Sequence, residues 1–471
     1  MSKTIEVRNP RTGKYDYVII PPPQKLLAQL CSRLRRAQKG WQQLEIEARV
    51  AAVQAWKQGI IASRDKLTEA LVADTGRLPT SILEVDSFLS TIDRWCQLAP
   101  KLIKDTAKET EIPFIQVQQT LVPYPLVGVI SPWNFPLLLS TIDAIPALLA
   151  GCAVIIKPSE IAPRFMNPLL TALNSVPQLR DVFTFIEGAG GTGVSLIDNV
   201  DAICFTGSVA TGRKVAEMAA KRFIPAYLEL GGKDPAMVLE SADLDLATSA
   251  ILWGAVVNTG QSCLSIERIY VAESIFEKFY HQLVTKAHDL KLAYPQLESG
   301  EIGPIIAEKQ AAIIANHLQD AVSQGAIIHC GGKVEELDGG YWCRPTVLTE
   351  VNHKMLVMRE ETFGPIMPVM AFSTVEEAVK LANDSIYGLS AAVFAGTEFE
   401  ALKVAHQIDA GAISINDASL TAIMHEGEKN AFKFSGLGGS RMGAAALARF
   451  MRKKAFLVKS KAIADPWWFN S

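Results

Sequence analysis

The chain has few cysteines, and their spacing argues against two classes of protein. Only seven occur among 471 residues, at positions 31, 96, 152, 204, 263, 330 and 343. The count is odd, and no two of them form a Cys-x-x-Cys pair. The pattern therefore fits neither a disulfide framework nor a zinc site with local ligand spacing. We expect a protein of a reducing compartment that binds no metal.

An excess of charge of either sign is also missing. Lys and Arg number 46 and Asp and Glu 49, so the formal net charge is −3. Nucleic-acid binding needs concentrated positive charge, so that class of function is disfavoured. The opening segment, MSKTIEVRNPRTGK, lacks the apolar core of a secretory signal. We expect a cytoplasmic protein.

One long stretch, residues 112–142, carries no charge and could span a bilayer on length alone. It is interrupted by prolines, and several glutamines lie among them. A membrane-spanning helix must be predominantly apolar and must satisfy its own backbone hydrogen bonds. We therefore expect a buried strand, loop and helix here, and no transmembrane segment.

The chain is long enough for two or three domains, and its 49% hydrophobic and 20% charged residues are ordinary for a globular protein with a large core. Leucines at helical spacing predict helices over residues 24–108. Residues 127–131 and 153–157 are short apolar runs, with a mostly apolar helix predicted at 136–149 between them. This βαβ pattern indicates a parallel sheet buried on both faces.

Alternation of strands and helices continues along the chain. It predicts further strands at 182–186, 202–205 and 226–230, and a helix at 209–220. After Gly231-Gly232 the alternation resumes and runs to 411–416, which predicts a second α/β domain. Open sheets of this type bind ligands at the carboxyl ends of their strands.

Two glycine-containing turns compete as a phosphate-binding site. Gly188–Gly193 has the form G-x-G-x-x-G after a predicted strand, but the acidic residue expected about 20 residues later is missing near Arg213. We favour a simple glycine-rich turn there. The segment from Phe205 through Gly207 and Ser208 opens a helix, whose free N–H groups and positive end suit a pyrophosphate. Taken alone, this segment is better explained as an ordinary capped helix.

A charged pair follows the strand at 153–157. Lys157 and Glu160 would lie at its carboxyl end, where a carboxylate can accept hydrogen bonds from both hydroxyls of an adenine ribose. The lysine could reach the same ribose or a phosphate. Without further support, the pair is equally a solvated strand end.

Cys263 is the candidate nucleophile. It follows a Gly-Gln-Ser turn after an apolar helix, whereas Cys152 and Cys204 lie in apolar segments where cysteine is usually a small hydrophobe. A reactive cysteine needs a nearby base or positive dipole, and no histidine is close in sequence. Glu229, a carboxylate in an apolar strand, is the alternative base. Its structural alternative is an ion pair, with Lys233 as one partner.

Six motifs in order make the chain resemble the aldehyde dehydrogenase superfamily, of the hydrolytic, NAD(P)-dependent type. They cover most of the sequence. The six are Pro132-Trp-Asn-Phe-Pro136, Lys157-Pro-Ser-Glu160, Phe205-Thr-Gly-Ser208, Leu228-Glu-Leu-Gly-Gly-Lys233, Gly260-Gln-Ser-Cys263 and Glu360-Glu-Thr-Phe-Gly-Pro365.

The resemblance implies a mechanism. Cys263 attacks an aldehyde to give a thiohemiacetal, and the Asn134 amide and the Cys263 N–H hold the oxyanion. Hydride transfer to NAD leaves a thioester, and Glu229 activates the water that releases the acid. The resemblance also implies the cofactor-binding residues. These are Ile130, Trp133, Lys157, Glu160, Gly207, Ser208, Leu230, Glu361 and Phe363.

The family fold implies an α/β architecture with three parts. A Rossmann-like NAD-binding domain would take residues 1–112 and 124–231, and a second α/β catalytic domain residues 232–434. A small β oligomerisation arm would combine 113–123 with 435–471. Strand pairing through that arm would make a homodimer or homotetramer. The tail is basic and ends with Trp467, Trp468 and Phe469; a membrane-surface anchor is an alternative to packing on a subunit.

The C-terminal segment departs from the family pattern. Where members often continue Ser-Gly-x-Gly with Arg-Glu, this chain has Gly439-Ser440. A carboxylate proposed in the family as a secondary proton relay is therefore missing, and water activation depends more heavily on Glu229. The residues that follow Cys263 are also unusual and leave the substrate entrance undefined.

The predicted substrate tunnel is apolar. By position, Phe135, Leu138, Ile142 and Leu264 resemble tunnel-lining residues, and no arginine is among them. Because a carboxylate-bearing semialdehyde needs a charged partner, we expect an apolar aliphatic or aromatic aldehyde. The alternative is that these residues only pack the core.

Glu160 should repel the additional phosphate of NADP, so NAD is the expected cofactor and NADP the alternative. Two competing functions remain. A CoA-acylating relative would typically lack the carboxylate at the position of Glu229. A catalytically silent binding member would have lost Cys263, Asn134 or Glu229, and all three are present.

Overall fold

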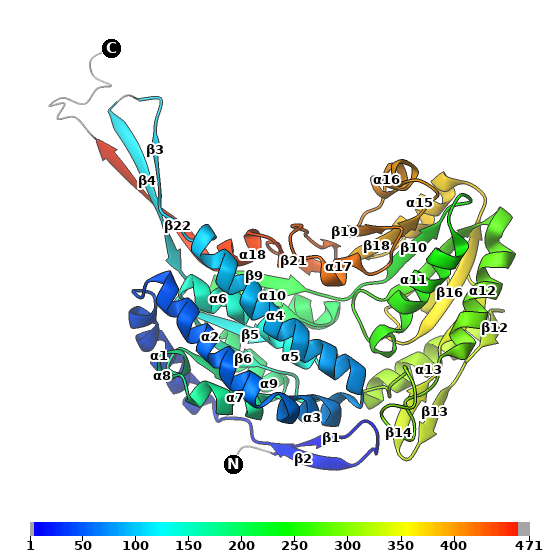
Figure 1. The fold of residues 1–471 in the computed structure, drawn as a ribbon, viewed down its shortest axis with the longest axis horizontal. Helices are drawn as coiled ribbons and strands as arrows, with labels where there is room; N and C mark the ends of the chain where they lie inside the picture. The colour runs from blue at the N-terminus through cyan, green and yellow to red at the C-terminus, as the bar shows by residue number, and fades with distance from the viewer. Residues whose placement is uncertain (1–3, 113, 460–471) are drawn as a thin grey trace.

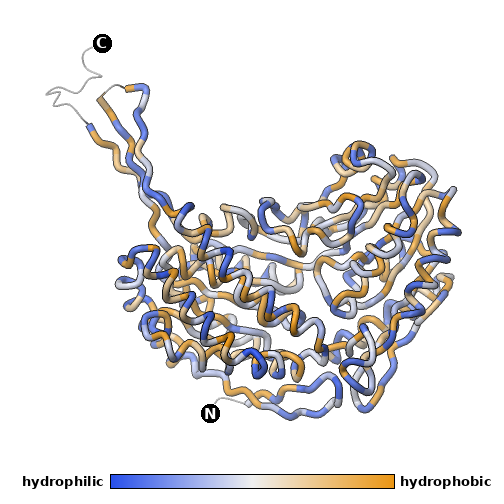
Figure 2. Tube along the Cα trace, viewed as in Figure 1, coloured by the Kyte–Doolittle hydropathy of each residue, from blue (hydrophilic) through white to orange (hydrophobic). Residues whose placement is uncertain are grey.

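Two open sheets form the centres of two lobes, and a narrow third sheet projects from the first lobe (Figure 1). The structure is a computed structural model that describes residues 4–112 and 114–459. Figure 2 shows apolar segments concentrated inside both lobes, with polar segments around them. The α/β class expected from the sequence is confirmed.

The first sheet has the strand order β21-β9-β8-β5-β6-β7. Its strands are β5 Leu126–Ile130, β6 Ala153–Lys157, β7 Phe183–Phe185, β8 Ala202–Thr206, β9 Ala226–Glu229 and β21 Gly436–Leu437. Only β21 runs antiparallel to its neighbour. Every residue of β5, β6 and β8 is buried, as continuous apolar runs in a doubly covered parallel sheet require.

Helices cover both faces of this sheet (Figure 1). They are α1 Gln24–Trp41, α2 Ile46–Ala62, α3 Arg64–Thr75, α4 Leu78–Leu102, α5 Pro136–Thr141, α6 Ala144–Ala150, α7 Met166–Asn174, α8 Pro177–Arg180, α9 Gly190–Ile197 and α10 Val209–Arg222. Trp56 packs edge-on against Phe88 and Phe183 in the core that they enclose.

The second sheet has the order β12-β15-β16-β11-β10-β18-β19 and is parallel except for β12. Its strands are β10 Asp234–Val238, β11 Ile266–Ala272, β12 Ile327–Cys330, β15 Thr346–Thr349, β16 Ile366–Phe372, β18 Ser390–Phe394 and β19 Ala412–Ile415. Around it lie α11 Leu244–Val256, α12 Phe276–Asp289, α13 Glu308–Ser323, α14 Leu356–Arg359, α15 Val375–Asn383, α16 Glu398–Ala405 and α17 Leu420–Ile423. Two minor two-stranded sheets pair β13 Val334–Leu337 with β14 Gly340–Cys343, and β17 Tyr387–Gly388 with β20 Phe432–Lys433.

The projecting sheet combines β3 Thr106–Glu109, β4 Ile115–Pro123 and β22 Met451–Lys459, preceded by α18 Ala445–Ala448. It extends away from both lobes in Figure 1. β3 lies within the range assigned from sequence to the cofactor domain, and β21 within the range assigned to the arm. The domain boundaries stay predictions. The tail with Trp467 to Phe469 lies outside the described residues.

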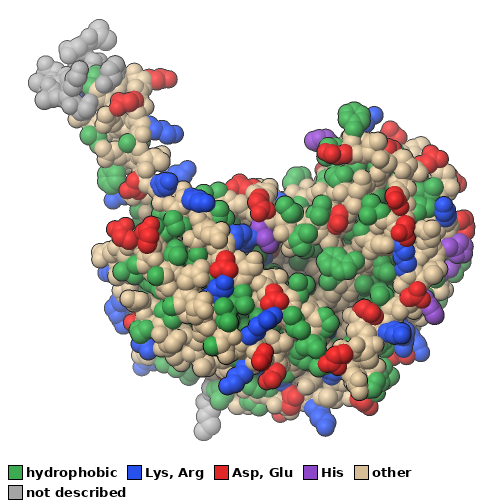
Figure 3. All heavy atoms as spheres, in the orientation of Figure 1, with side chains coloured by type: hydrophobic (Ala, Val, Ile, Leu, Met, Phe, Trp, Pro, Cys, Tyr) green, Lys and Arg blue, Asp and Glu red, His purple; other side chains and the backbone are tan. Residues whose placement is uncertain are grey.

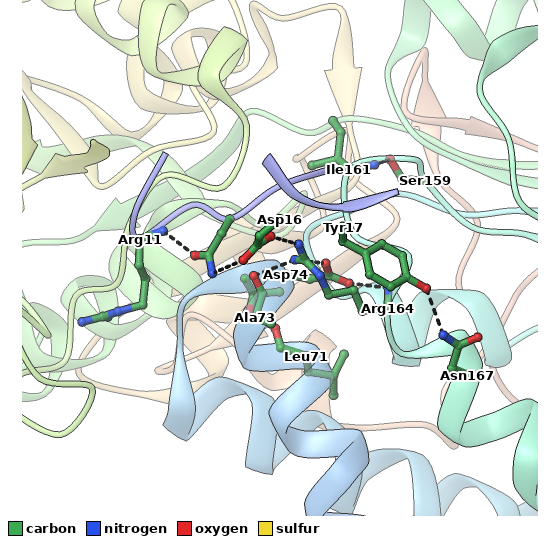
Figure 4. Close-up of polar contacts among 12 residues, drawn as sticks. Arg11, Asp16, Tyr17, Leu71, Ala73, Asp74, Ser159, Ile161, Arg164 and Asn167 are labelled. Carbon is green, nitrogen blue, oxygen red and sulfur yellow. Dashed lines mark hydrogen bonds and ion pairs between the residues drawn. The ribbon is translucent and has the colours of Figure 1, made fainter. Parts of the chain in front are cut away.

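The N-terminal hairpin, β1 Ile5–Arg8 and β2 Tyr15–Ile19, is tied to the first lobe by polar contacts (Figure 4). Arg164 bonds to Asp74 at 2.7 Å and also to Asp16 of the hairpin. Asn167 of α7 donates to the Tyr17 hydroxyl at 2.9 Å. These contacts fasten the start of the chain beside α3.

The predicted helix at 136–149 is wrong as a single element. α5 ends at Thr141 and α6 starts at Ala144. Pro146 has no N–H to donate to the carbonyl of Ile142, so a continuous helix would be broken there; proline is tolerated in the first turn of a new helix. In the glycine-rich segment, α9 starts at Gly190, so only its beginning is a turn. None of the described helices has the length and apolar character needed to cross a membrane.

Candidate active site

A pocket of about 150 Å³ lies where the carboxyl ends of β5, β8 and β9 meet the second lobe. The surface is hollowed between the two lobes in Figure 3. The pocket brings together residues that the sequence analysis named from widely separated motifs. Predicted residues that line it are Trp133, Asn134, Gly207, Ser208, Leu230, Cys263, Glu361 and Phe363.

The turn before Cys263 has an unusual backbone. Asn258, Thr259 and Gly260 all have positive φ, at 58°, 58° and 68°. A β-branched residue such as Thr259 is rarely found there, so the turn is strained and must be held by its surroundings. A Cβ added at Gly260 would lie 2.3 Å from the Gly364 carbonyl, so this position requires glycine.

A buried polar network holds this turn. Arg77, at the start of α4, donates to the carbonyls of Asn258 at 2.9 Å and Asn134 at 3.3 Å. The Asn258 side chain donates to the Asn134 carbonyl, and the Asn134 side chain donates to the Gln261 carbonyl at 3.0 Å. An amide nitrogen carries two hydrogens. Asn134 therefore keeps one donor for the pocket that it lines.

Cys263 is half-buried, and its thiol is held in the neutral form at rest. Burial, together with the nearby charges of Glu361, Asp234 and Glu229, raises its pKa to about 12, and Lys429 opposes this shift. A thiolate is the nucleophilic form. To act as the predicted nucleophile, the Cys263 thiol would therefore have to lose its proton.

Glu229 ends β9 beside the pocket and is half-buried. Its backbone carbonyl accepts from the Gly207 N–H at 3.1 Å, which joins the two strand ends. Its charge is among those that act on the Cys263 thiol. The alternative pairing with Lys233 is wrong, because the Lys233 ammonium lies 2.6 Å from Glu267.

The double glycine after Glu229 permits two close approaches. A Cβ at Gly231 would lie 2.5 Å from the Glu361 carboxylate, and one at Gly232 would lie 2.3 Å from the Cys263 carbonyl. Any side chain at Gly232 would push the Cys263 backbone away. The glycines thus bring the cysteine and Glu361 to one end of β9.

Glu361 lies inside the pocket and accepts from the Gly232 N–H at 3.0 Å. Burial and the charge of Glu267 raise its pKa to about 8. Glu267 accepts from the N–H groups of Thr362 and Phe363, both at 2.7 Å, and so fixes the segment that carries Glu361. The sequence analysis noted Glu267 only as unusual and missed this role.

The predicted cofactor-binding residues form a second group, at the carboxyl ends of the strands of the first sheet; we call this group the cofactor edge. The Lys157 ammonium is almost fully buried and donates to the carbonyls of Pro158 at 2.8 Å and Gly188 at 2.6 Å, with Glu160 at 3.5 Å. Burial lowers its pKa. Ile130 pairs with Lys157 across β5 and β6. Ser208 caps α10 by accepting from the Thr211 N–H at 3.4 Å.

The remaining predicted residues are only partly brought together. Trp133 and Phe363 pack edge-to-face, with ring centroids 5.5 Å apart. The four predicted tunnel residues, Phe135, Leu138, Ile142 and Leu264, do not line the pocket, which Leu139 lines instead. Their role stays a prediction.

Several residues of the site were missed from sequence. Thr206 and Gln310 line the pocket, and Arg77 supports the cysteine turn. Arg441 donates to Thr206, the strand partner of Glu229. Arg77 and Arg441 carry no local motif, so no sequence signal identified them. Among residues 4–112 and 114–459, no cluster of His, Cys, Asp and Glu could hold a metal ion.

Comparison with known proteins agrees with this arrangement. A sequence model described as the aldehyde dehydrogenase family matches residues 1–456. The chain belongs to the aldehyde dehydrogenase family. As a member, it is an oxidoreductase of the family whose reaction is the oxidation of aldehydes to acids.

Relatives within the family carry different substrate names. A 4,4′-diapolycopene aldehyde oxidase of Methylomonas is 38% identical over 94% of this chain and 84% of its own length. A putative NADP-linked succinate-semialdehyde dehydrogenase of Mycolicibacterium smegmatis is 34% identical over 92% of this chain and 85% of its own.

Solved structures of aldehyde dehydrogenases superimpose closely. A putative aldehyde dehydrogenase, PutA, from Anabaena variabilis has a TM-score of 0.98 at 75% identity, covering 99% of this chain and 100% of its own. Betaine aldehyde dehydrogenase from Staphylococcus aureus, in complex with NAD⁺, has a TM-score of 0.91 at 30% identity, covering 99% of this chain and 93% of its own.

Proposed function

We propose that this aldehyde dehydrogenase oxidises apolar aliphatic or aromatic aldehydes with NAD, through a thioester on Cys263. The observation that carries the proposal is the pocket in which Cys263, Asn134 and Glu361 meet the ends of β8 and β9, with Glu229 beside them. Both lobes contribute to this pocket: Gly207 and Ser208, which we expect to bind the cofactor, come from the first lobe, and Cys263 comes from the second.

The residues at the carboxyl ends of β6 and β8 fit a dinucleotide. The Glu160 side chain is 36% exposed and free to accept from ribose hydroxyls, and buried Lys157 holds it in place. Ser208 begins a helix of 14 residues, whose positive end suits a pyrophosphate. NAD, when bound, accepts a hydride from the substrate carbon. A carboxylate at Glu160 disfavours the extra phosphate of NADP.

In this mechanism the Cys263 thiol loses its proton to solvent, and the resulting thiolate attacks the carbonyl carbon, forming a C–S bond while the carbonyl oxygen becomes an oxyanion. The free hydrogen of the Asn134 amide and the Cys263 N–H stabilise that charge. Loss of hydride from the same carbon restores the carbonyl as a thioester. Glu229 then takes a proton from water, the hydroxide adds to the thioester, and cleavage of the C–S bond releases the acid.

The apolar side chain of Leu139, which lines the pocket, supports an apolar aldehyde. A tunnel formed by Phe135, Leu138, Ile142 and Leu264 stays a prediction. The test is NADH formation with NAD and aldehydes of short, long, aromatic and carboxylated types. We expect activity with apolar members, none for Cys263→Ala, and full activity for Cys330→Ala, a half-buried cysteine of the second lobe. A folded protein that oxidises no aldehyde would overturn the proposal.

A second candidate substrate is an aldehyde that carries a carboxylate. Lys429 places positive charge near Cys263, and it also acts on His425, which is near Arg94. Two buried Arg94 nitrogens, Nε and Nη1, and the Nδ1 of His425 have no hydrogen-bond partner in the described part of the chain. If carboxylated aldehydes prove the better substrates, Arg94→Met should raise their KM without affecting apolar ones.

We also propose that the projecting sheet pairs subunits into a homo-oligomer. Its strand β22 carries Phe456 and Leu457 at 44% and 75% exposure, and apolar side chains on a sheet edge favour association. Light scattering should give a dimer or tetramer for the intact protein. Leu457→Asp should shift it toward monomer, and a monomeric intact protein would contradict the proposal.

A further inference from the structure

A buried ionic cluster lies behind Glu229 and takes no part in the mechanism above. Arg441 donates from Nε and Nη2 to the two oxygens of Asp143, at 3.2 and 2.9 Å. Its Nη2 also donates to the Thr206 hydroxyl at 2.6 Å. Arg449 binds the same Asp143. All of these side chains are less than a tenth exposed.

Strand register places this cluster against the general base. Thr206 of β8 is the direct partner of Glu229 in parallel β9. Paired residues of neighbouring parallel strands point to the same face of the sheet. The Glu229 side chain therefore lies on the face where Arg441 bonds to Thr206.

Charge connects the two groups as well. Burial lowers the pKa of Arg441, but the charges of Asp143 and Glu229 raise it, and the net direction is upward. Asp143 is shared by two arginines, so its single negative charge does not balance them. The Glu229 carboxylate is the next anion that acts on Arg441.

We propose that Arg441 is a positioning residue for Glu229: fixed by Asp143 and Thr206, its guanidinium stabilises the anionic carboxylate that takes a proton from water. This role rests on the proposed function. The C-terminal segment of this chain lacks the carboxylate that family members often carry after Ser-Gly-x-Gly, and it supplies Arg441 instead. A guanidinium stays protonated and cannot accept that proton. In this chain the C-terminal segment, through Arg441, therefore stabilises the anionic form of Glu229 and does not accept the proton that Glu229 takes from water.

Other charged or titratable groups surround Glu229, and each could influence its pH dependence. Cys263 and Glu361 line the pocket, and the charge of Lys429 acts on Cys263. Cys204 and Tyr227 lie on the same sheet face as Glu229. Asp143 immediately precedes α6, and Arg441 and Arg449 come from the C-terminal segment. Of these, Arg441 is the cation bonded to the strand partner of Glu229.

The experiment compares Arg441→Met, Arg441→Lys and Arg449→Met with the wild type. Arg449→Met is the matched control, because it also removes a guanidinium from Asp143 but has no bond to Thr206. Rapid mixing with NAD and the best aldehyde separates the first NADH burst from the steady state, which reports thioester hydrolysis. The hydrolysis rate is measured from pH 5 to 9, and melting temperatures establish that each variant is folded.

We expect Arg441→Met to keep the burst, to slow hydrolysis about tenfold, and to move the acidic limb of its pH profile upward by about one unit, since an opposite charge nearby shifts such equilibria by about this much. Arg441→Lys should keep the wild-type limb but hydrolyse several-fold more slowly, because a single ammonium nitrogen cannot reproduce the two-nitrogen contact with Asp143 together with the bond to Thr206. Arg449→Met should keep the wild-type limb.

Two results would overturn the inference: an unchanged rate and limb in folded Arg441→Met, or an equal limb shift in Arg449→Met. If Arg441→Met does not fold, an unchanged hydrolysis rate in Arg441→Lys overturns it. A wild type with neither burst nor turnover for any aldehyde would instead refute the proposed function, on which the role of Arg441 depends.

Discussion

Two regions of the molecule are stabilised in opposite ways: the turn before Cys263, the proposed nucleophile, and the proposed cofactor edge, which holds Lys157 and Ser208. Around Cys263, Gln261 donates to the Pro304 carbonyl and accepts from the Ile306 N–H, while Arg77 reaches in from α4. At the cofactor edge, Ser208 caps its own helix and Lys157 bonds to the neighbouring Pro158. The turn before Cys263 is positioned by contacts that are distant in sequence, whereas Ser208 and Lys157 are positioned mostly by local contacts. Changes at the first should therefore impair chemistry, and changes at the second should weaken binding.

The largest expected effect is that of Asn134→Ala on chemistry. Removal of one oxyanion donor lowers kcat by about 100- to 1000-fold. The turn should persist, because Arg77 and Asn258 bind the backbone carbonyl that alanine retains. Steady-state kinetics measure the loss, with Asn199→Ala in the first lobe as control. A drop smaller than tenfold would exclude Asn134 as a main oxyanion donor.

Arg77→Met should affect both stability and rate. It leaves the carbonyls of Asn258 and Asn134 without their buried charged donor, which costs about 3 kcal/mol of folding free energy. The strained turn should relax, and kcat should fall at least tenfold. Denaturant unfolding and kinetics test both, beside the exposed Arg36→Met. Wild-type kcat with lowered stability would show that the turn holds without Arg77.

Glu84, a buried residue of α4 near Arg77, should also make the stability of the fold depend on pH. Burial raises the pKa of Glu84 to about 8, although its bonds to the Leu138 and Leu137 N–H groups and the charge of Arg77 oppose this. An acid whose folded pKa is raised stabilises the fold fully below its unfolded value, near pH 4.5, and loses that contribution as pH rises through 8.

Glu84→Gln should remove this dependence. Glutamine cannot ionise but can still accept from the Leu138 N–H. We expect the wild type to lose on the order of 2 kcal/mol more than the variant between pH 5 and pH 9. Melting temperatures across that range measure the difference, with the exposed Glu69→Gln as control. Parallel curves for the wild type and Glu84→Gln would contradict the prediction.

The smallest expected effect lies at the cofactor edge. Ser208→Ala removes a helix cap, which costs about 1 kcal/mol, and should raise the KM for NAD a few-fold with little change in kcat. Thr397→Ala, which removes the same kind of cap from α16, is the matched control and should leave the KM unchanged. A large fall in kcat for Ser208→Ala would contradict the prediction that changes in this region weaken cofactor binding and leave the chemical step unaffected.

Sequence patterns predicted this fold well where local chemistry decides the structure. The apolar runs of β5 and β6 are found within a residue of their predicted positions, because a strand buried on both faces has few alternatives. The division of the 136–149 helix was not predicted. It depends on Pro146 together with burial of Asp143 against the C-terminal segment, which no local pattern reveals.

The candidate site shows the same limit. Cys263, Asn134 and Glu361 could be gathered from motifs, and the structure brings them into one pocket. The partner of Lys233 could not be chosen from sequence. Glu229 is four residues away, but Glu267 lies at the start of β11, the neighbour of β10, and pairing across adjacent strands decides the contact. Long-range polar partners such as Arg77 and Arg441 are hidden for the same reason.

The pairing of β21 with β9 sets an order for folding during synthesis. Gly436 bonds beside Glu229, and Arg441 follows within the same segment, about 200 residues after the strand that they complete. While the chain is still on the ribosome, the parallel strands β5 to β9 can assemble early. The β9 edge of this sheet then stays unpaired until the second lobe and β21 have been synthesised. Glu229, the proposed general base, thus reaches its final surroundings near the end of translation, and a chain that stops short of residue 436 would keep Cys263 but lack the strand that pairs beside Glu229.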